Sequence, residues 1–170
     1  PIPSRGLGDV YKRQEKKMIL DVEKMNALGR VQIQLFDADG NLKEEQHVKN
    51  LVVTTGLNHI ADRLGASSPA TRMSHMEVGT GTTAPAAGNT ALETAISSSR
   101  VTLTSQTVST NTVEYVGDFP AGTGTGAVTE AGVFNASSSG TMLCRTTFSV
   151  VNKGAADTLK ITWTLTVSDT

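Results

Sequence analysis

The side chain best suited to chemistry in this sequence is Glu130, an isolated acid beside small residues in an otherwise apolar, strand-like segment. A buried carboxylate needs a partner, because an unpaired charge inside a protein is costly. Arg100 or Arg145 could supply it. Two interpretations of Glu130 therefore stand side by side: a structural ion pair that fixes strand register or a subunit contact, and a simple outward-facing strand residue.

No other combination of side chains indicates catalysis. A polysaccharide hydrolase needs two carboxylates facing a cleft, and only Glu114 and Asp118 approach such a pair. Four residues apart on one strand, they would be roughly 13 Å apart, too far for either standard glycosidase geometry. No G-x-S-x-G motif marks a nucleophilic serine. The three histidines, His47, His59 and His75, do not have the spacing that is typical of zinc ligands. We expect no catalytic residues, no cofactor and no metal site.

Two loops rich in glycine and threonine, 79–81 and 122–126, resemble phosphate-binding loops only superficially. They lack the lysine of a P-loop and do not lie between a strand and a following helix. We interpret them as tight turns and places of close backbone approach. They are predicted to present contact surface through Thr80, Gly81, Thr82, Pro85, Gly122 and Gly124.

The segment Asp37–Asn41 has the wrong spacing for a calcium loop and is interpreted as a hairpin turn.

Composition narrows the class of protein further. The 170 residues carry 15 basic and 16 acidic side chains, a net charge of −1, with no basic run. The sequence therefore lacks the excess of basic residues that binding to nucleic acid or to an anionic membrane requires. The single cysteine, Cys144, rules out an intramolecular disulfide framework. No apolar stretch reaches the roughly 18 residues of a membrane span and no signal peptide is evident, so we expect synthesis in a cytoplasm and release by lysis.

The N-terminal segment is not expected to belong to the folded domain. The string SRGLGDVYKRQ at residues 4–14 resembles a translated sequencing-library adapter, as expected for a sequence assembled from environmental reads. We expect residues 1–24 to be an irregular extension derived from the adapter or an untranslated region, with the native start at Met18 or Met25. Residues 25–170 then suffice for one domain with a single core.

Alternation of apolar and polar residues predicts a succession of short strands. They cover residues 31–36, 42–48, 50–55, 73–78, 100–107, 112–119, 127–134, 141–150 and 158–167. The last is the clearest, because one face collects Leu159, Ile161, Trp163, Leu165 and Val167. The pattern predicts an all-β fold, a β-sandwich or jelly-roll-like architecture, whose aromatic anchors are Phe119, Phe134, Phe148 and Trp163.

One short helix is predicted over residues 55–64. Its apolar face is formed by residues at helical spacing, namely Leu57, Ile60, Ala61 and Leu64. Thr54 or Thr55 is available as the N-cap, and Gly65 as the stop. A brief helical turn is also predicted over 91–96.

Three segments together resemble a known group of proteins. They are NLVVTTGLNHIADRL at 50–64, MEVGTGTTAP at 76–85 followed by TAL at 90–92, and the stretch from TEAGVFN at 129–135 to MLCR at 142–145. In order and spacing they are similar to small structural proteins of bacteriophage virions, of the tail, tail-fibre or head-appendage kind. The resemblance covers about residues 31–167 and implies a β-sandwich subunit of a virion. It brings no catalytic residues, and such proteins often carry Asp at the position of Asn89.

The resulting hypothesis is a non-catalytic virion protein that forms a symmetric homo-oligomer or binds other virion proteins through its β faces and its Gly/Thr loops. A carbohydrate- or cell-surface-binding module, with a host surface glycan as its partner, is the alternative. A sugar site usually stacks the ring on an exposed aromatic side chain, and the candidates are Trp163, which is predicted to be buried, and Tyr115. A polysaccharide hydrolase is less favoured. The number of subunits, the place in tail or capsid, and the host stay open.

Overall fold

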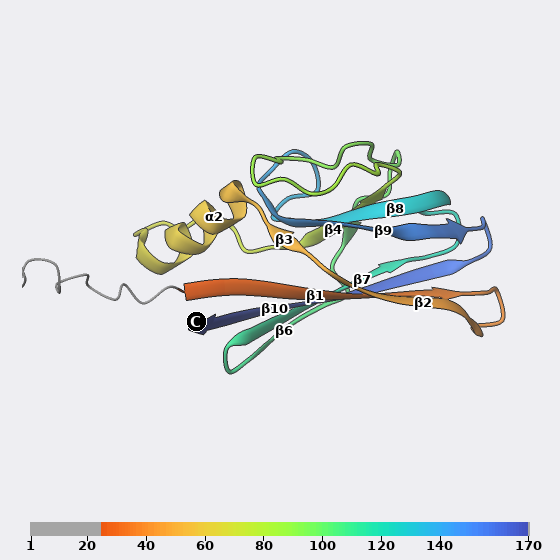
Figure 1. Ribbon diagram of the computed structural model, residues 1–170, viewed down its shortest axis with the longest axis horizontal. Coiled ribbons are helices and arrows are strands. Elements are labelled where there is room, and N and C mark those ends of the chain that lie inside the picture. Colours follow the sequence, from red (N-terminus) through yellow and green to blue (C-terminus); the bar gives the residue numbers. More distant parts are fainter. Residues whose placement is uncertain (1–24, 170) are drawn as a thin grey trace, which may run out of the picture.

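The chain folds into two antiparallel β-sheets that pack face to face, with one helix at an end of the molecule (Figure 1). The computed structural model describes residues 25–169, so the predicted extension over 1–24 lies outside the described residues. The first sheet contains, in spatial order, β2 (Leu42–Lys49), β1 (Met25–Phe36), β10 (Thr158–Asp169), β7 (Thr112–Phe119) and β6 (Ser105–Ser109). The second contains β3 (Leu51–Val52), β9 (Met142–Lys153), β8 (Gly126–Phe134), β4 (His75–Gly79) and β5 (Val101–Thr102). With α2 (Thr54–Gly65) as the helix, the predicted all-β, sandwich-like fold is confirmed.

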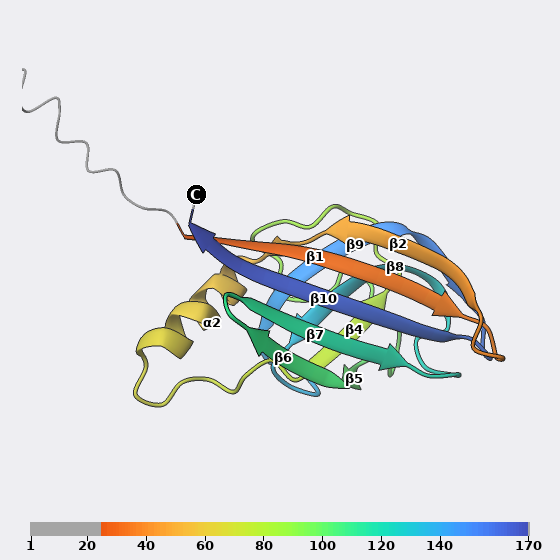
Figure 2. The same ribbon diagram turned by 90° about the horizontal axis from the view of Figure 1, so that it is seen from below.

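Strands β1 and β10 pair along their whole length, from Met25 opposite Asp169 to Phe36 opposite Thr158. Alternate side chains of both strands point into the sandwich, because successive residues of a strand face opposite ways. The predicted apolar face of the closing strand is buried in β10 up to Leu165, which is 3% exposed, whereas Val167 is half-buried. Both ends of the described chain therefore lie side by side, at the end of the sandwich that also carries α2 (Figure 2).

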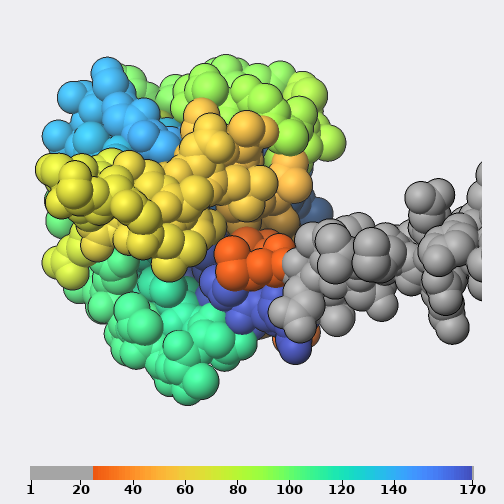
Figure 3. Space-filling model, turned by 90° about the vertical axis from the view of Figure 1, so that its left-hand side faces the viewer, coloured from red at the N-terminus to blue at the C-terminus, as the bar shows by residue number. Residues whose placement is uncertain are grey.

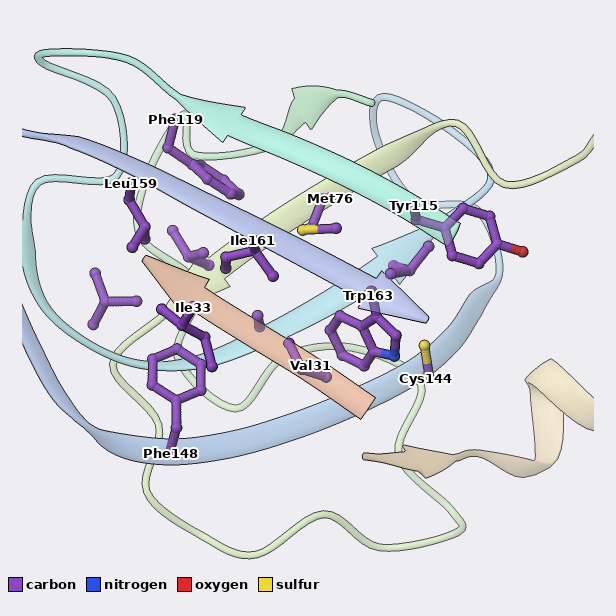
Figure 4. Close-up of a cluster of buried hydrophobic side chains, with 14 of the residues drawn as sticks. Val31, Ile33, Met76, Tyr115, Phe119, Cys144, Phe148, Leu159, Ile161 and Trp163 are labelled. Carbon is purple, nitrogen blue, oxygen red and sulfur yellow. The ribbon is translucent and has the colours of Figure 1, made fainter. Parts of the chain in front are cut away.

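The main core lies between the two sheets (Figure 4). Its largest fully buried side chains are Trp163 and Phe119, and Phe148 joins them as predicted. The fourth predicted anchor, Phe134, lies elsewhere. It points to the outer face of the second sheet, where it forms a smaller cluster with Val53, Leu92 and Met142. The second sheet is therefore buried on part of both faces, which strand alternation alone does not reveal.

The predicted strand over 100–107 is in fact two strands in different sheets. Residues 101–102 form β5 in the second sheet, and residues 105–109 form β6 in the first. The crossing occurs at Leu103 and Thr104, where the Leu103 amide donates to the Ser74 carbonyl and the Thr104 amide donates to the Val116 carbonyl, at 2.9 and 2.8 Å. The prediction of one continuous strand was wrong because apolar alternation persists across this crossing.

The helix is where the sequence predicted it, but it presents a different side to the sandwich. Its buried residues are Gly56 and His59, while Leu57 is 51% and Leu64 77% exposed. A Cβ on Gly56 would lie 2.0 Å from the Leu143 carbonyl oxygen. The helix can therefore lie this close to β9 only because residue 56 has no Cβ. The predicted threonine cap was wrong: the helix begins after Val53 without a side-chain cap. Within residues 25–169, no helix is long and apolar enough to cross a membrane.

Burial of the Tyr115 ring predicts a pH-dependent loss of stability. The ring is 5% exposed, and desolvation raises the pKa of its hydroxyl to about 12. In the unfolded chain the hydroxyl ionises near its ordinary pKa of 10, so the unfolded state loses this proton first as the pH rises. As the pH rises from about 10 to about 12, the free energy of unfolding should therefore decrease by up to about 1.4 kcal/mol per pH unit.

Urea unfolding at a series of alkaline pH values measures this slope. Tyr115→Phe is the control, because the variant keeps the ring and removes the ionising group. An equal alkaline slope in both proteins would contradict the assignment to Tyr115.

Candidate functional site

Glu130 and Arg145 form an ion pair on the outer face of the second sheet. Across β8 and β9, Glu130 lies opposite Thr147 and Arg145 opposite Gly132, so the two side chains are diagonal neighbours on one face. Arg145 Nε donates to Glu130 Oε2 at 2.9 Å, and Nη2 lies 2.8 Å from the same oxygen. Glu130 is 0% and Arg145 1% exposed. Of the two interpretations of Glu130, the structure places it in the ion pair, with Arg145 as its partner.

The Glu130 carboxylate also holds the backbone of the segment that follows β4. Its Oε1 accepts hydrogen bonds from the amides of Gly81 and Thr94, at 3.0 and 2.8 Å, and Oε2 accepts one from the Glu93 amide at 3.0 Å. The two ends of residues 81–94 are thus tied to one buried side chain. A Cβ at Gly79 or Gly81 would lie 2.5 Å from Oε1, so these glycines allow the close approach.

Arg145 extends the network on its other side. Its Nη1 donates to Asn89 Oδ1 at 3.1 Å, and Nη2 lies 3.6 Å from Glu93 Oε2. Glu93 in turn accepts hydrogen bonds from Thr83 Oγ1 and the Thr83 amide, at 2.6 and 2.8 Å. The Thr83 bonds lower the pKa of the Glu93 carboxyl below its ordinary value, with Arg145 a smaller cause. The result is a charged cluster of Glu130, Arg145, Glu93 and Asn89, named the loop anchor below.

Arg100 belongs to a different contact. Its Nη2 donates to Glu77 Oε2 at 2.7 Å, and Nη1 donates to the Ser139 carbonyl at 2.8 Å. The guanidinium also lies 3.8 Å above the Phe134 ring, a cation–π geometry. The structure therefore does not bring Arg100 to Glu130, because Arg100 is paired with Glu77 of β4.

The predicted contact loops are exposed only in part. Thr80, Thr82 and Gly122 are exposed and Pro85 is half-buried, whereas two of the predicted contact residues, Gly81 and Gly124, are buried. Gly81 lies on the loop anchor, and Gly124 packs beside Val78 with a φ of +64°. These two positions serve packing rather than surface contact, because the absence of a side chain lets the backbone enter a tight space.

The helical turn predicted over 91–96 was also wrong. Residues 94–96 run extended beside β4, with a bridge between Gly79 and Ala95 and a hydrogen bond from the Thr80 amide to the Thr94 carbonyl at 2.8 Å. Residues 80–99 thereby form a covering layer over the second sheet, visible in green at the top of Figure 1. Leu92 anchors this layer in the smaller apolar cluster.

The remaining candidate residues lie apart. His47 is exposed on β2, His59 is on α2 and His75 begins β4. Among residues 25–169, no three His, Cys, Asp or Glu side chains gather as metal ligands would. In the hairpin turn after β1, Asp37 Oδ1 accepts hydrogen bonds from the amides of Asp39 and Asn41. Gly40 there has a φ of +83°, so this segment is the hairpin turn that was predicted.

Two members of the loop anchor, Glu93 and Asn89, were not identified from the sequence as site residues. Glu93 did carry a signal, since it is the only acid between Glu77 and Glu114 and lies in a stretch of small and hydroxyl residues. An isolated acid there resembles the context that singled out Glu130. Asn89 carries no comparable signal, because asparagine is common in loops.

An apolar groove of about 420 Å³ opens between α2 and the end of the sandwich. Leu64 of α2 and Val108 of β6 line it from two sides and are 77% and 71% exposed. Further apolar lining comes from Ile60, Met73, Val113, Tyr115, Leu143, Leu165 and Val167. Figure 3 faces this end of the molecule, with α2 in yellow next to the β6–β7 hairpin in green. Two arginines, Arg63 and Arg72, also line it.

Comparison with protein-family models, with curated proteins and with solved structures finds no match for this chain.

Proposed function

We propose that this protein is a non-catalytic structural subunit of a bacteriophage virion, of the tail or head-appendage kind. In this proposal it assembles with further copies of itself through the end of the sandwich that carries α2, and with other virion proteins. The virion role rests on the resemblance of three segments to small virion proteins, namely 50–64, 76–85 with 90–92, and 129–135 with 142–145. The exposed apolar face of α2 is the single observation that carries assembly.

Part of the apolar face of α2 lacks a cover within residues 25–169: Ile60 packs against the main core, but Leu57 and Leu64 do not. Leu57 and Leu64 are spaced for one face of a helix, yet both are more than half exposed. An amphipathic helix ordinarily buries such a face against its own protein. Contiguous exposed apolar surface marks a site of protein contact. Together with Val108 across the groove, this end of the molecule has the composition of an interface core.

The shape of this end suits a second copy of the chain. Leu64 and Val108 project from the rim, and the apolar groove lies between them. A surface with both projecting side chains and a matching groove is able to pair with itself, since a two-fold interface uses the same patch on both subunits. A cyclic oligomer of more than two copies could also form, with the projecting side chains of each subunit in the groove of the next.

The loop anchor supports a mechanical role. A segment of small, mostly uncharged residues, 80–92, is fastened to the sheet by a buried carboxylate and an arginine. Contact residues are effective when a rigid scaffold positions them. In the proposed function this covering layer presents Thr80, Thr82 and Pro85 to a neighbouring virion protein.

Replacing Leu64 with glutamate should weaken self-assembly. The variant replaces an exposed apolar side chain of the proposed interface with a charge, and truncation of a hot-spot contact typically changes binding by about 2 kcal/mol or more. We expect the full-length chain to form a species of defined mass in light scattering over a concentration series. In Leu64→Glu, the dissociation constant should rise at least about tenfold.

Leu42→Glu is the matched control. Leu42 is 50% exposed and lies at the far end of the sandwich, opposite Phe36, the last residue of β1. It should leave the mass of the assembly unchanged. A monomer at every concentration that also fails to bind any virion protein would overturn the proposed function, and equal effects of the two variants would reject the α2 end as the interface.

A further inference from the structure

The outer face of the first sheet carries a second groove, and most of the residues that line it are polar or charged. Val31 and Trp163 point into the core, so their neighbours along β1 and β10 point outward. The groove measures about 570 Å³ and has as its polar lining Arg30, Gln32, His47, Lys49, Glu114, Thr162 and Thr164. Figure 2 looks onto this face across β2, β1, β10 and β7.

Strand register arranges these side chains in two rows. One row crosses four strands through Lys49, Arg30, Thr164 and Glu114. The next row consists of His47, Gln32 and Thr162. Neighbouring strands lie about 4.8 Å apart, so each row places a polar group at every such step. Amide and hydroxyl groups, which both donate and accept hydrogen bonds, fill the middle of this face.

Positive charge is concentrated at one end of the first row. Arg30 and Lys49 are direct cross-strand partners and both are exposed. Like charges opposite each other destabilise a sheet. Within residues 25–169, neither lies within 4.0 Å of a carboxylate, whereas His47 contacts Glu45 at 2.6 Å. A lysine on an edge strand also prevents edge pairing, but this explanation does not apply to Arg30, because β1 is an interior strand.

We infer that this groove binds an acidic polysaccharide, one whose sugars carry carboxylates. The guanidinium of Arg30 matches the two oxygens of a carboxylate, and Lys49 adds a second positive charge beside it. Thr162 and Thr164 would bind sugar hydroxyls, as would the carbonyl oxygen of Gln32, whose Nε2 already donates to Glu45 Oε1 at 2.9 Å. Glu114 would accept a hydrogen bond from a sugar hydroxyl at the other end of the row. Binding would neutralise the charge pair that the sheet leaves uncompensated.

Recognition here would use charge and hydrogen bonds rather than aromatic stacking. Trp163 and Tyr115, the stacking residues expected for a sugar site, are buried at 0% and 5% exposure. A nucleic acid fits the groove less well, because single strands are held largely by stacking of their bases on aromatic side chains. Among residues 25–169, no Phe, Tyr or Trp lines this groove.

The test is a calorimetric titration of the full-length chain at low ionic strength with polygalacturonate, dextran and single-stranded DNA as separate ligands. We expect saturable binding of polygalacturonate that weakens with added salt, and no comparable binding of dextran or DNA. Arg30→Gln should weaken polygalacturonate binding about tenfold, as loss of a hydrogen-bonded charge pair implies.

Lys160→Gln is the matched control. Lys160 pairs with Gln34 on the same sheet face but does not line the groove, so this variant removes one positive charge elsewhere. Equal weakening by both variants, equal binding of dextran or DNA, or no binding at all would each overturn the inference. The titration is repeated on Leu64→Glu: retained binding there shows that the groove acts independently of assembly, so the two proposals fail separately.

Discussion

Replacing Glu130 with alanine is expected to lower the free energy of unfolding by about 3–5 kcal/mol, the range for breaking one side of a buried ion pair. The variant leaves Arg145 charged and almost fully buried, 1% exposed. It also removes the acceptor for three backbone amides, those of Gly81, Glu93 and Thr94. Urea denaturation followed by far-UV circular dichroism measures the change.

A second variant separates the charge effect from simple loss of contacts. The double variant Glu130→Leu with Arg145→Met removes both charges and should recover part of the lost stability, because a buried pair replaced by apolar residues is often nearly neutral. The three amides remain without their acceptor, so recovery should be incomplete. Glu114→Ala, at an exposed position on β7, is the control and should change stability by less than about 0.5 kcal/mol. A loss below about 1 kcal/mol in Glu130→Ala would contradict the anchoring role.

The second large effect is expected in the main core. Trp163→Ala should lower the free energy of unfolding by about 3–5 kcal/mol, since it opens a cavity between the two sheets. Trp163 is 0% exposed and packs in the cluster that contains Phe119 and Ile161. Its Nε1 has no hydrogen-bond partner among the described residues. Trp163→Phe should therefore lose less, because it keeps most of the packing and removes an unpaired donor.

Far-UV circular dichroism again serves as the measurement, because Trp163 is the only tryptophan and its fluorescence is lost in both variants. Leu42→Ala truncates an apolar side chain that is 50% exposed and should be nearly neutral. Similar losses for Trp163→Ala and Trp163→Phe would indicate that the indole nitrogen matters to stability through a partner.

Trp163 and the loop anchor bear on the proposed function in different ways. Trp163 lies between the sheets, so its truncation should weaken the whole sandwich. The loop anchor lies on the outer face, so its loss should also free residues 81–94, which Glu130 holds at both ends. If residues 80–92 contact a neighbouring virion protein, Glu130→Gln should lower the affinity for that neighbour. The loss of affinity should be larger than the fraction of unfolded protein in this variant can explain.

Local sequence determined most of the strands and the position of the helix. Period-two alternation in β10 places Leu159, Ile161 and Trp163 on one face whatever the rest of the fold does, because side-chain direction in a strand is fixed by the backbone. The turn at Asp37–Asn41 is similarly local, since the Asp37 side chain bonds the amides of its own turn. Glu130 was recognisable as unusual for the same reason: an acid among apolar neighbours needs a partner wherever the strand lies.

Only the tertiary structure decided which partner Glu130 has and which faces stay open. Arg145 and Arg100 were equivalent candidates in the sequence, and the pairing register of β8 with β9 selects Arg145. The face that α2 presents depends on how closely Gly56 can approach β9, so periodicity alone predicted burial for Leu64 and the structure exposes it. Alternation and helical spacing are properties of neighbouring residues, whereas ion-pair choice, strand crossing and surface grooves depend on residues that are distant in the chain and meet only after folding.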